Sequence, residues 1–307
     1  MNAAVLLLGY AAALIWLGPP LLRRVTGAGV PPRLAVAAWL TAVTGAVGAW
    51  LAAVAALLVA DVGSMWRNSA LSLCLKALGV AGQIGLPRPV GSVLAVGLLA
   101  TGLIITGVAA MRVASRVRGL RARSRAHASA ARLIGRPTDR PGVVVVPAGR
   151  AAAYCVAGRP RAVVVTTAAL DRLDEPQLAA VLAHEQAHLS GRHHDLLTVL
   201  RALAASFPRL PLFSAAADAV AALLEMCADD VAVRRHGSLP LLRGLLALAG
   251  APASAPAAVL GAADTAVLQR AERLLAPARC WRHRATLTAV IAAATITPVA
   301  AALACQL

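Results

Sequence analysis

Long apolar stretches dominate the pattern of hydrophobic and polar positions along the chain. A bilayer-spanning helix needs about 20 mostly apolar residues, and four stretches meet this requirement: residues 3–22, 34–60, 91–111 and 285–305. Arginines follow the third stretch, with Val113, Val117 and Leu120 at helical spacing. We therefore expect the third span to continue out of the bilayer as an amphipathic helix. The pattern predicts a mainly α membrane protein with four transmembrane helices.

Between the third and fourth spans the periodicity changes. Short β-rich runs separated by Pro, Gly and Arg predict a small sheet, at residues 143–146, 151–156 and 162–167. A helix is then expected from Asp174, with Pro176 in its first turn and Gln177 at the capping-box spacing. The pattern predicts three units: spans one to three over residues 1–111, an α+β domain over 112–284, and the fourth span over 285–307.

Two connecting segments carry no assignable chemistry. Residues 61–90 read as a weakly charged loop whose middle resembles a surface helix, and residues 250–263 are rich in Ala, Pro and Gly. Asp264 is then expected to cap another helix that runs to about Leu275. These segments separate the predicted units and add no candidate site.

Composition agrees with a membrane protein and suggests its orientation. The chain is 59 % hydrophobic and only 14 % charged, whereas soluble domains average about 25 % charged. The net charge of +17 comes from arginines beside the apolar spans, and aromatic residues make up only 3 %. This distribution favours contact with anionic membrane lipids over direct nucleic-acid binding. By the positive-inside rule, both termini lie outside and residues 112–284 lie in the cytoplasm.

The strongest chemical motif is His184-Glu185-Gln186-Ala187-His188. Residues four apart lie on one face of a helix, so His184 and His188 can share one zinc ion. Glu185 is then placed to act as the general base towards a water molecule. The cysteines show no C-x-x-C pair, which argues against a thiolate zinc site and a disulfide scaffold: Cys74, Cys155, Cys227, Cys280 and Cys305.

Two candidates compete for the third ligand. Locally, Gly191 and His194 complete the metzincin pattern H-E-x-x-H-x-x-G-x-x-H. Further on, Glu225 could be the ligand, with Asp229 one turn later holding a ligand histidine by its other ring nitrogen. We favour Glu225, because residues 196–224 predict a helix, a proline-containing turn and a second helix that returns Glu225 to the first. No convincing Met-turn is present, since Met226 lies within that second helix.

Four segments carry a family resemblance: AAAYCVAGRPRAVVVTTAALDRLDEPQLAAVLAHEQAHLSGRHHD, FPRLPL, LEMCADDVAVRR and VLQRAERLL. They resemble the BlaR1/MecR1-type membrane metallopeptidases of family M56 and, more distantly, the M48 peptidases of HtpX and Ste24 type. The resemblance implies a zincin-like (gluzincin) domain between spans three and four, with one Zn²⁺ per chain and zinc endopeptidase activity in a bacterial cell membrane. It also implies an edge strand that holds the substrate as an extra strand: Tyr154, Cys155, Val156, Ala157 and Gly158.

The resemblance further implies a regulatory role, in which the protein substrate is a BlaI-type transcriptional repressor. The chain ends shortly after Cys305, so the extracellular penicillin-binding domain of the antibiotic receptors is not expected. Two alternatives stay open: an HtpX-like quality-control protease, and a non-enzymatic signalling scaffold. A cation at the end of the second helix, Arg234 or His236, is a candidate oxyanion stabiliser; the alternative is a solvated helix end.

Overall fold

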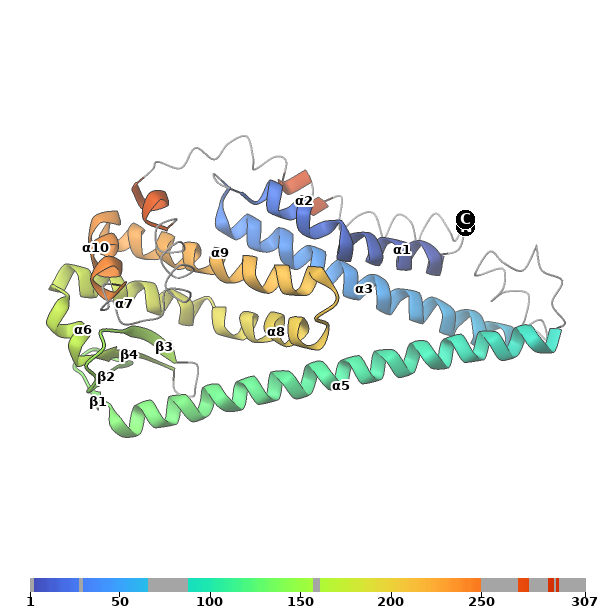
Figure 1. The fold of residues 1–307 in the computed structure, drawn as a ribbon, viewed down its shortest axis with the longest axis horizontal. Helices are drawn as coiled ribbons and strands as arrows, with labels where there is room; N and C mark the ends of the chain where they lie inside the picture. Colours follow the sequence, from blue (N-terminus) through green and yellow to red (C-terminus); the bar gives the residue numbers. More distant parts are fainter. Residues whose placement is uncertain are drawn as a thin grey trace.

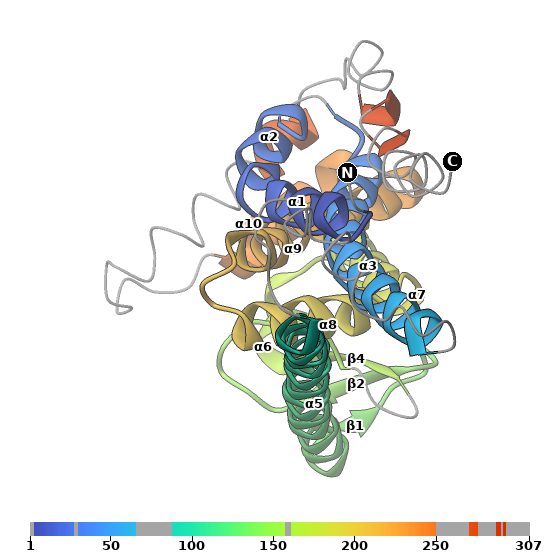
Figure 2. The same cartoon turned by 90° about the vertical axis from the view of Figure 1, so that its right-hand side faces the viewer.

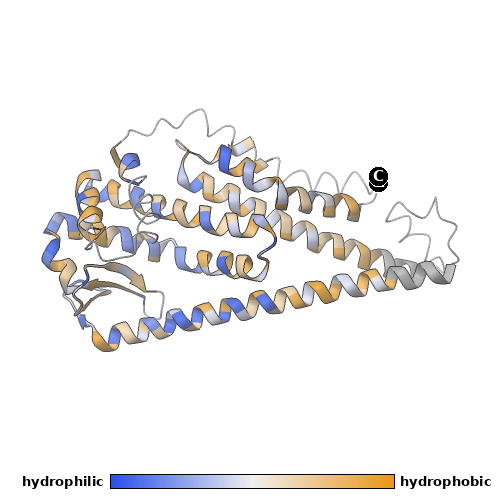
Figure 3. Cartoon of the chain, viewed as in Figure 1, coloured by the Kyte–Doolittle hydropathy of each residue, from blue (hydrophilic) through white to orange (hydrophobic). Residues whose placement is uncertain are grey.

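A single long helix, α5 (Arg88–Ile134), runs the whole length of the molecule (Figure 1). The computed structural model describes residues 3–27, 30–65, 88–156, 161–249, 270–275, 287–289 and 291–292. The described side chains in the first half of α5 are mostly apolar, and polar residues become frequent among apolar ones in its second half (Figure 3). The structure therefore confirms that the third predicted span continues as one helix beyond its apolar part, because nothing in residues 112–134 breaks the helix.

The first predicted span is two helices rather than one. α1 (Ala3–Trp16) and α2 (Gly18–Val25) meet at a bend of 54°. Pro19 and Pro20 stand in the first turn of α2, where proline is tolerated, but they remove the N–H groups that would continue α1 across the break. Together the pair passes the test for a membrane span by length and composition. The structure thus replaces the single helix expected over residues 3–22 with a bent pair of helices, and this pair still qualifies as one candidate span.

Three of the described helices are long and apolar enough to cross a membrane by themselves: Pro32–Val59, Val96–Ile134 and Pro211–His236. The first belongs to α3 (Pro32–Met65) and the second to α5. The third is α9 (Pro211–His236), and more than half of its most apolar stretch is buried inside the protein. Most of the expected fourth span lies outside the described residues, as do the middle of the loop over 61–90 and the loop over 250–263.

The first half of α3 is covered by protein. Ala35, Trp39 and Ala42 share a core with Leu212 and Val220 of α9. Further along α3, Trp50 donates a hydrogen bond of 3.1 Å to Thr106 of α5. The apolar stretch that predicted a span over 34–60 thus serves two purposes, because its beginning packs in a protein core and its end lies beside the apolar half of α5.

The sheet contains four strands, β1 (Arg136–Pro137), β2 (Val143–Val146), β3 (Ala153–Val156) and β4 (Ala162–Thr166), in the order β1-β2-β4-β3. β2 and β4 are parallel, and the other two pairs are antiparallel. The three predicted strands are confirmed, whereas β1 was missed because it has only two residues. β3 pairs with β4 on one side only and is an edge strand.

Four helices, α6 to α9, follow the sheet along the chain. α7 (Glu175–Ser190) follows α6 (Thr167–Arg172), and α8 (His193–Ser206) leads through a turn at residues 207–210 into α9. The backbone N–H of Gln177 donates to Asp174 at 2.8 Å, which confirms the predicted cap of α7. α7, α8 and α9 lie between the sheet and the helices α1 to α3 (Figure 2), and α10 (Ser238–Ala249) packs on α7.

Candidate metal centre

Three side chains from two helices converge at the centre of the domain. His184 and His188 stand one turn apart on α7, and Glu225 comes from α9, which packs directly against α7. The Nε2 atoms of the two histidines are 3.1 Å apart, and each lies 3.4 Å from a carboxylate oxygen of Glu225. The helical hairpin expected from the sequence therefore brings these three groups together.

These separations match the donor set of a tetrahedral zinc site. With zinc–ligand bonds of 2.0–2.2 Å, tetrahedral geometry places neighbouring donor atoms about 3.3 Å apart. The three donors all lie within 4.8 Å of one another, and His184 is buried. Two imidazoles and one carboxylate also form a donor set that suits zinc in catalytic sites and leaves the fourth position open. The residues present therefore fit one zinc ion.

Asp229 stands behind His184. Its Oδ1 lies 3.0 Å from Nδ1 of His184, and its side chain is 1 % exposed, although the two atoms are not aligned as a hydrogen bond. Burial by itself lowers the pKa of His184, but contact with Asp229 and Glu225 outweighs it and raises the pKa to about 9. The ring is therefore held by a carboxylate on the side away from the proposed ligand atom, which is where the sequence placed Asp229.

Arg270 pairs with Asp229 and Glu225, two of the carboxylates of this centre. It belongs to a helical segment over residues 270–275. It donates to both oxygens of Asp229, at 2.8 and 2.6 Å, and its Nη1 lies 3.3 Å from Glu225. Such a bidentate arrangement is among the strongest ion pairs in proteins. The sequence analysis missed this arginine, because a pair 41 residues apart leaves no periodic signal.

His193 holds His188 in the way that Asp229 holds His184. Its Nδ1 lies 2.9 Å from Nδ1 of His188, and the two rings meet edge to face. His193 is buried at the start of α8. Burial, together with the neighbouring His188, lowers the pKa of His193 to about 4. A neutral His193 can accept the Nδ1 proton of His188, which leaves Nε2 of His188 free to bind a metal.

Glu185 lies beside the edge strand β3. Burial raises the pKa of its carboxyl group, which faces the backbone N–H of Cys155. Burial and the charge of Glu185 raise the pKa of the Cys155 thiol to about 12, so this thiol stays protonated at neutral pH. The strand predicted over residues 154–158 is thus present from Ala153 to Val156; Ala157 and Gly158 lie outside the described residues.

Two sequence-level candidates lie apart from this centre. Nε2 of His194 is 2.8 Å from the hydroxyl of Ser124 on α5, so the geometry does not support the metzincin alternative. Arg234 and His236 are exposed at the C-terminal end of α9, at least nine residues and about 14 Å along the helix from Glu225. The geometry does not support their assignment as oxyanion stabilisers either, because α9 runs straight on and carries them away.

Comparison with known families fits the chemistry of these side chains. Residues 119–252 match the model of Peptidase family M48. The matched segment begins on the polar half of α5 and contains the sheet, the H-E-x-x-H helix and Glu225 with Asp229. M48 peptidases are zinc metalloproteases, so the match indicates a metallopeptidase, and the apolar helices indicate a membrane protein. No curated protein and no solved structure matched the chain.

The M48 match corrects the emphasis of the sequence analysis. That analysis placed family M56 first and M48 second, whereas the match supports M48. Both expectations rested on the same four segments, and the H-E-x-x-H and E-x-x-x-D patterns among them lie within the M48 match. Arg270 lies beyond the matched segment, although it completes the same centre.

Proposed function

We propose that the chain is a membrane-anchored zinc endopeptidase whose metal ligands are His184, His188 and Glu225. The observation that carries this proposal is the convergence of the two histidine Nε2 atoms, which are 3.1 Å apart, on the carboxylate of Glu225, where each lies 3.4 Å from a different oxygen. The M48 match supports a metallopeptidase independently of this geometry. The geometry and the family match thus both support a metallopeptidase, and the matched segment contains all three proposed ligands.

Each residue of the centre has a distinct part in peptide-bond hydrolysis. Zinc, when bound, supplies a Lewis acid that polarises the substrate carbonyl and lowers the pKa of a water molecule. Glu185 accepts the proton of the attacking water and passes it to the leaving amine. The raised pKa of Glu185 suits both steps, because a carboxyl group that titrates closer to neutral pH can take up and release a proton. Asp229 and His193 keep the two imidazoles in the orientation that binding needs.

The substrate is proposed to bind as an extra strand along β3. Cys155 of this edge strand places its backbone N–H beside Glu185, so a peptide paired with β3 would pass the metal centre. Main-chain hydrogen bonds of this kind fix the register of a peptide without demanding a particular sequence. The bond to be cleaved would then lie over the open side of the three ligands.

We further propose that the catalytic domain faces the cytoplasm and acts on a protein there. The resemblance to family M56 supports one repressor as the substrate, and the M48 match supports quality control of membrane proteins as the alternative. The two functions differ in the number of substrates. When a regulatory protease is inactive, one protein stays uncleaved, whereas an inactive quality-control protease leaves many proteins uncleaved. Absence of stoichiometric zinc from the purified protein would favour the third alternative, a scaffold without enzymatic activity.

The proposal is tested by Glu185→Gln, compared with the wild type in purified form and in cells. The variant keeps all three metal ligands, so we expect unchanged zinc content and at least a ~100-fold loss of cleavage of an unfolded protein such as casein. A proteomic comparison of the two cell lines then identifies the substrates. An unchanged cleavage rate in Glu185→Gln would remove the enzymatic function.

A further inference from the structure

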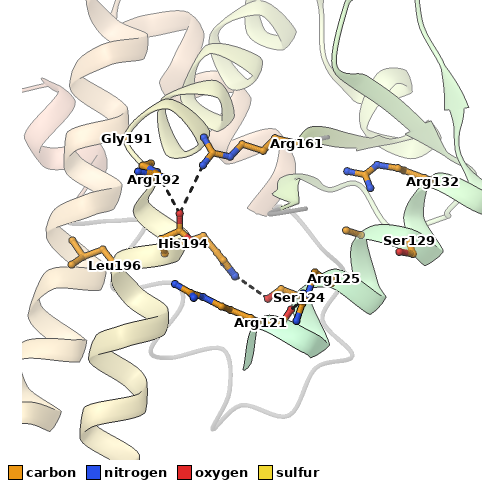
Figure 4. Close-up of a pocket in the computed structure, with 12 residues that line it drawn as sticks. Arg121, Ser124, Arg125, Ser129, Arg132, Arg161, Gly191, Arg192, His194 and Leu196 are labelled. Carbon is orange, nitrogen blue, oxygen red and sulfur yellow. Dashed lines mark hydrogen bonds and ion pairs between the residues drawn. The ribbon is translucent and has the colours of Figure 1, made fainter. Parts of the chain in front are cut away.

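A cavity lies beside the turn that joins α7 to α8, on the side of the turn away from the metal centre. Its volume is about 940 Å³, and the polar half of α5 forms one wall (Figure 4). The turn itself forms the opposite wall with Gly191, Arg192 and His194. The two neighbouring histidines of this turn face in different directions: His193 contacts His188, whereas His194 contacts Ser124 on α5. The cavity is therefore separate from the metal centre but shares the turn with it.

Positive charge gathers around this cavity. Arginines contribute five of the lining residues, from three parts of the chain: Arg121, Arg125, Arg132, Arg161 and Arg192. Asp195 is the one carboxylate among the described residues that line it. Arg161 and Arg192 both approach that carboxylate, at 3.8 and 3.6 Å. Five like charges around one space repel one another, and a single carboxylate compensates only one of them.

The three arginines of α5 point to the same space because of their spacing. Arg121, Arg125 and Arg132 stand at i, i+4 and i+11, which places them on one face of the helix. Arg116 and Arg123 lie on the opposite face and do not line the cavity. Nη2 of Arg132 is buried and has no hydrogen-bond partner within the part of the chain that the structure describes. A buried donor without an acceptor costs about 1–3 kcal/mol, and an anion in the cavity would supply one.

We propose that this cavity binds a phosphate-bearing ligand of about nucleotide size. Guanidinium groups match phosphate oxygens with paired hydrogen bonds. A terminal phosphate carries a charge of about −1.5 to −2, which offsets an excess of several arginines better than a single carboxylate does. The volume of 940 Å³ falls in the range of about 300–1,000 Å³ that is usual for small-molecule pockets. This proposal does not depend on the peptidase function.

The position of the cavity favours a soluble ligand over a lipid headgroup. Arg121 comes ten residues after Met111, the last residue before the arginine run, which is about 15 Å along the helix. The headgroup layer on each side of a bilayer is only about 5–8 Å thick. Arg132 lies farther along the helix still, so with the bilayer boundary at Met111, where the predicted apolar span ends, we expect the cavity to lie beyond the headgroup layer.

The test uses the full-length protein in nanodiscs of zwitterionic lipid, with pyrophosphate as the probe and calorimetry at about 0.15 M salt. We expect saturable binding of one pyrophosphate per chain. The double variant Arg121→Gln/Arg125→Gln should weaken it at least about tenfold, because each arginine provides a charge-assisted hydrogen bond. Arg116→Gln/Arg123→Gln is the matched control. It removes the same charge from exposed positions of the same helix, and its affinity should stay within about twofold of the wild type.

Three results would overturn the proposal: no saturable binding, equal weakening in both double variants, or a polyglutamate peptide that binds more tightly than pyrophosphate with the same variant dependence. The last result would assign the cavity to an acidic peptide. Nanodiscs that contain phosphatidylglycerol separate the two sources of phosphate. Unchanged pyrophosphate binding in them assigns the cavity to a soluble phosphate, whereas competition assigns it to a lipid phosphate.

Discussion

Each proposed zinc ligand is held from behind by a polar group. Asp229 lies 3.0 Å from His184, His193 lies 2.9 Å from His188, and Arg270 lies 3.3 Å from Glu225. Supporting groups of this kind fix the orientation of a ligand and its protonation state. At the residue scale, the centre is therefore six side chains rather than three, and the supporting three are open to separate tests.

The role of His193 is tested with its neighbour as the control. In His193→Ala, His188 loses its partner at Nδ1, so we expect zinc affinity to fall about 10–100-fold. His194→Ala removes a histidine that bonds Ser124 and should leave zinc affinity unchanged. Competition with a chromophoric chelator measures the zinc affinity of both variants. His193→Asn should lose less zinc affinity than His193→Ala. Equal affinities in the two alanine variants would show that His193 does not support the metal centre.

Arg270 should contribute strongly to stability. Its side chain is 13 % exposed and pairs with the buried Asp229, so Arg270→Met removes the guanidinium partner of a buried carboxylate, leaves only His184 beside it, and should cost about 3–5 kcal/mol. Arg273→Met removes a partly exposed pair with Asp230 and should cost less than about 1 kcal/mol. Denaturant unfolding of the zinc-free protein in detergent measures the difference. Similar losses in the two variants would contradict the account.

The sequence could predict those residues of the metal centre that lie close together along the chain. His184, Glu185 and His188 form a local motif with helical spacing. Glu225 and Asp229 required only a hairpin, whose turn is marked by proline. Arg270 and His193 left no such signal, because their partners are set by how helices pack and by how a turn aims its side chains. For Arg234 and His236, the exposed end of α9 favours the alternative left open by the sequence, a solvated helix end.

At the scale of elements, the turn between α7 and α8 joins the metal centre to the arginine-lined cavity. Arg192 has a left-handed backbone conformation there, with φ of 53°. A Cβ added at Gly191 would lie 2.4 Å from Nε2 of His193, closer than such atoms approach. The backbone of the turn thus packs directly against the ring of His193, and a side chain at position 191 would clash with that ring.

Gly191→Ala should therefore damage both stability and metal binding. The ring of His193 must move away from His188, so we expect a loss of about 1–3 kcal/mol together with weaker zinc binding. Gly119→Ala is the matched control: Gly119 lies within α5 with nothing within 4 Å of an added Cβ, and alanine there should stabilise by up to about 1 kcal/mol. Thermal unfolding and zinc titration report the outcome. Unimpaired zinc binding in Gly191→Ala would contradict this view of the turn.

The predicted elements were most accurate where local signals were strong. The cap at Asp174 marked the start of α7, and continuous runs of β-branched residues marked β2 and β4. The break between α1 and α2 was missed, although Pro19 and Pro20 mark it. Strand β1 was missed because two residues carry no periodicity, and its pairing depends on β2.

At the scale of the whole molecule, hydropathy alone does not show which part of α3 packs against other helices of the protein. Leucine and alanine are equally suited to a protein core and to lipid, so their hydropathy could not show that the first half of α3 packs on α9. The hydrogen bond between Trp50 and Thr106 aligns the later part of α3 with the apolar half of α5. Ser124, beside the turn after the metal helix, then lies about 20 Å beyond Met111 along α5. The polar half of α5 thus forms a helical stalk between its apolar half and the sheet.

The orientation of this stalk is tested by proteolysis of cells that express the protein. The arginine-rich part of α5 should be protected when trypsin is added to intact spheroplasts and cleaved after permeabilisation, because positive charge favours the cytoplasmic side. Immunoblotting of the fragments provides the measurement, with a periplasmic protein as the control for access. Cleavage in intact spheroplasts would place the metal centre outside.

The most direct test of the account is the zinc content of three purified proteins, measured by mass spectrometry of the metal. The account predicts about one zinc per chain in the wild type and in His194→Ala, and close to none in Glu225→Ala, because two histidines alone hold zinc too weakly to survive purification. Zinc retained in Glu225→Ala and lost from His194→Ala would contradict the proposed ligand set.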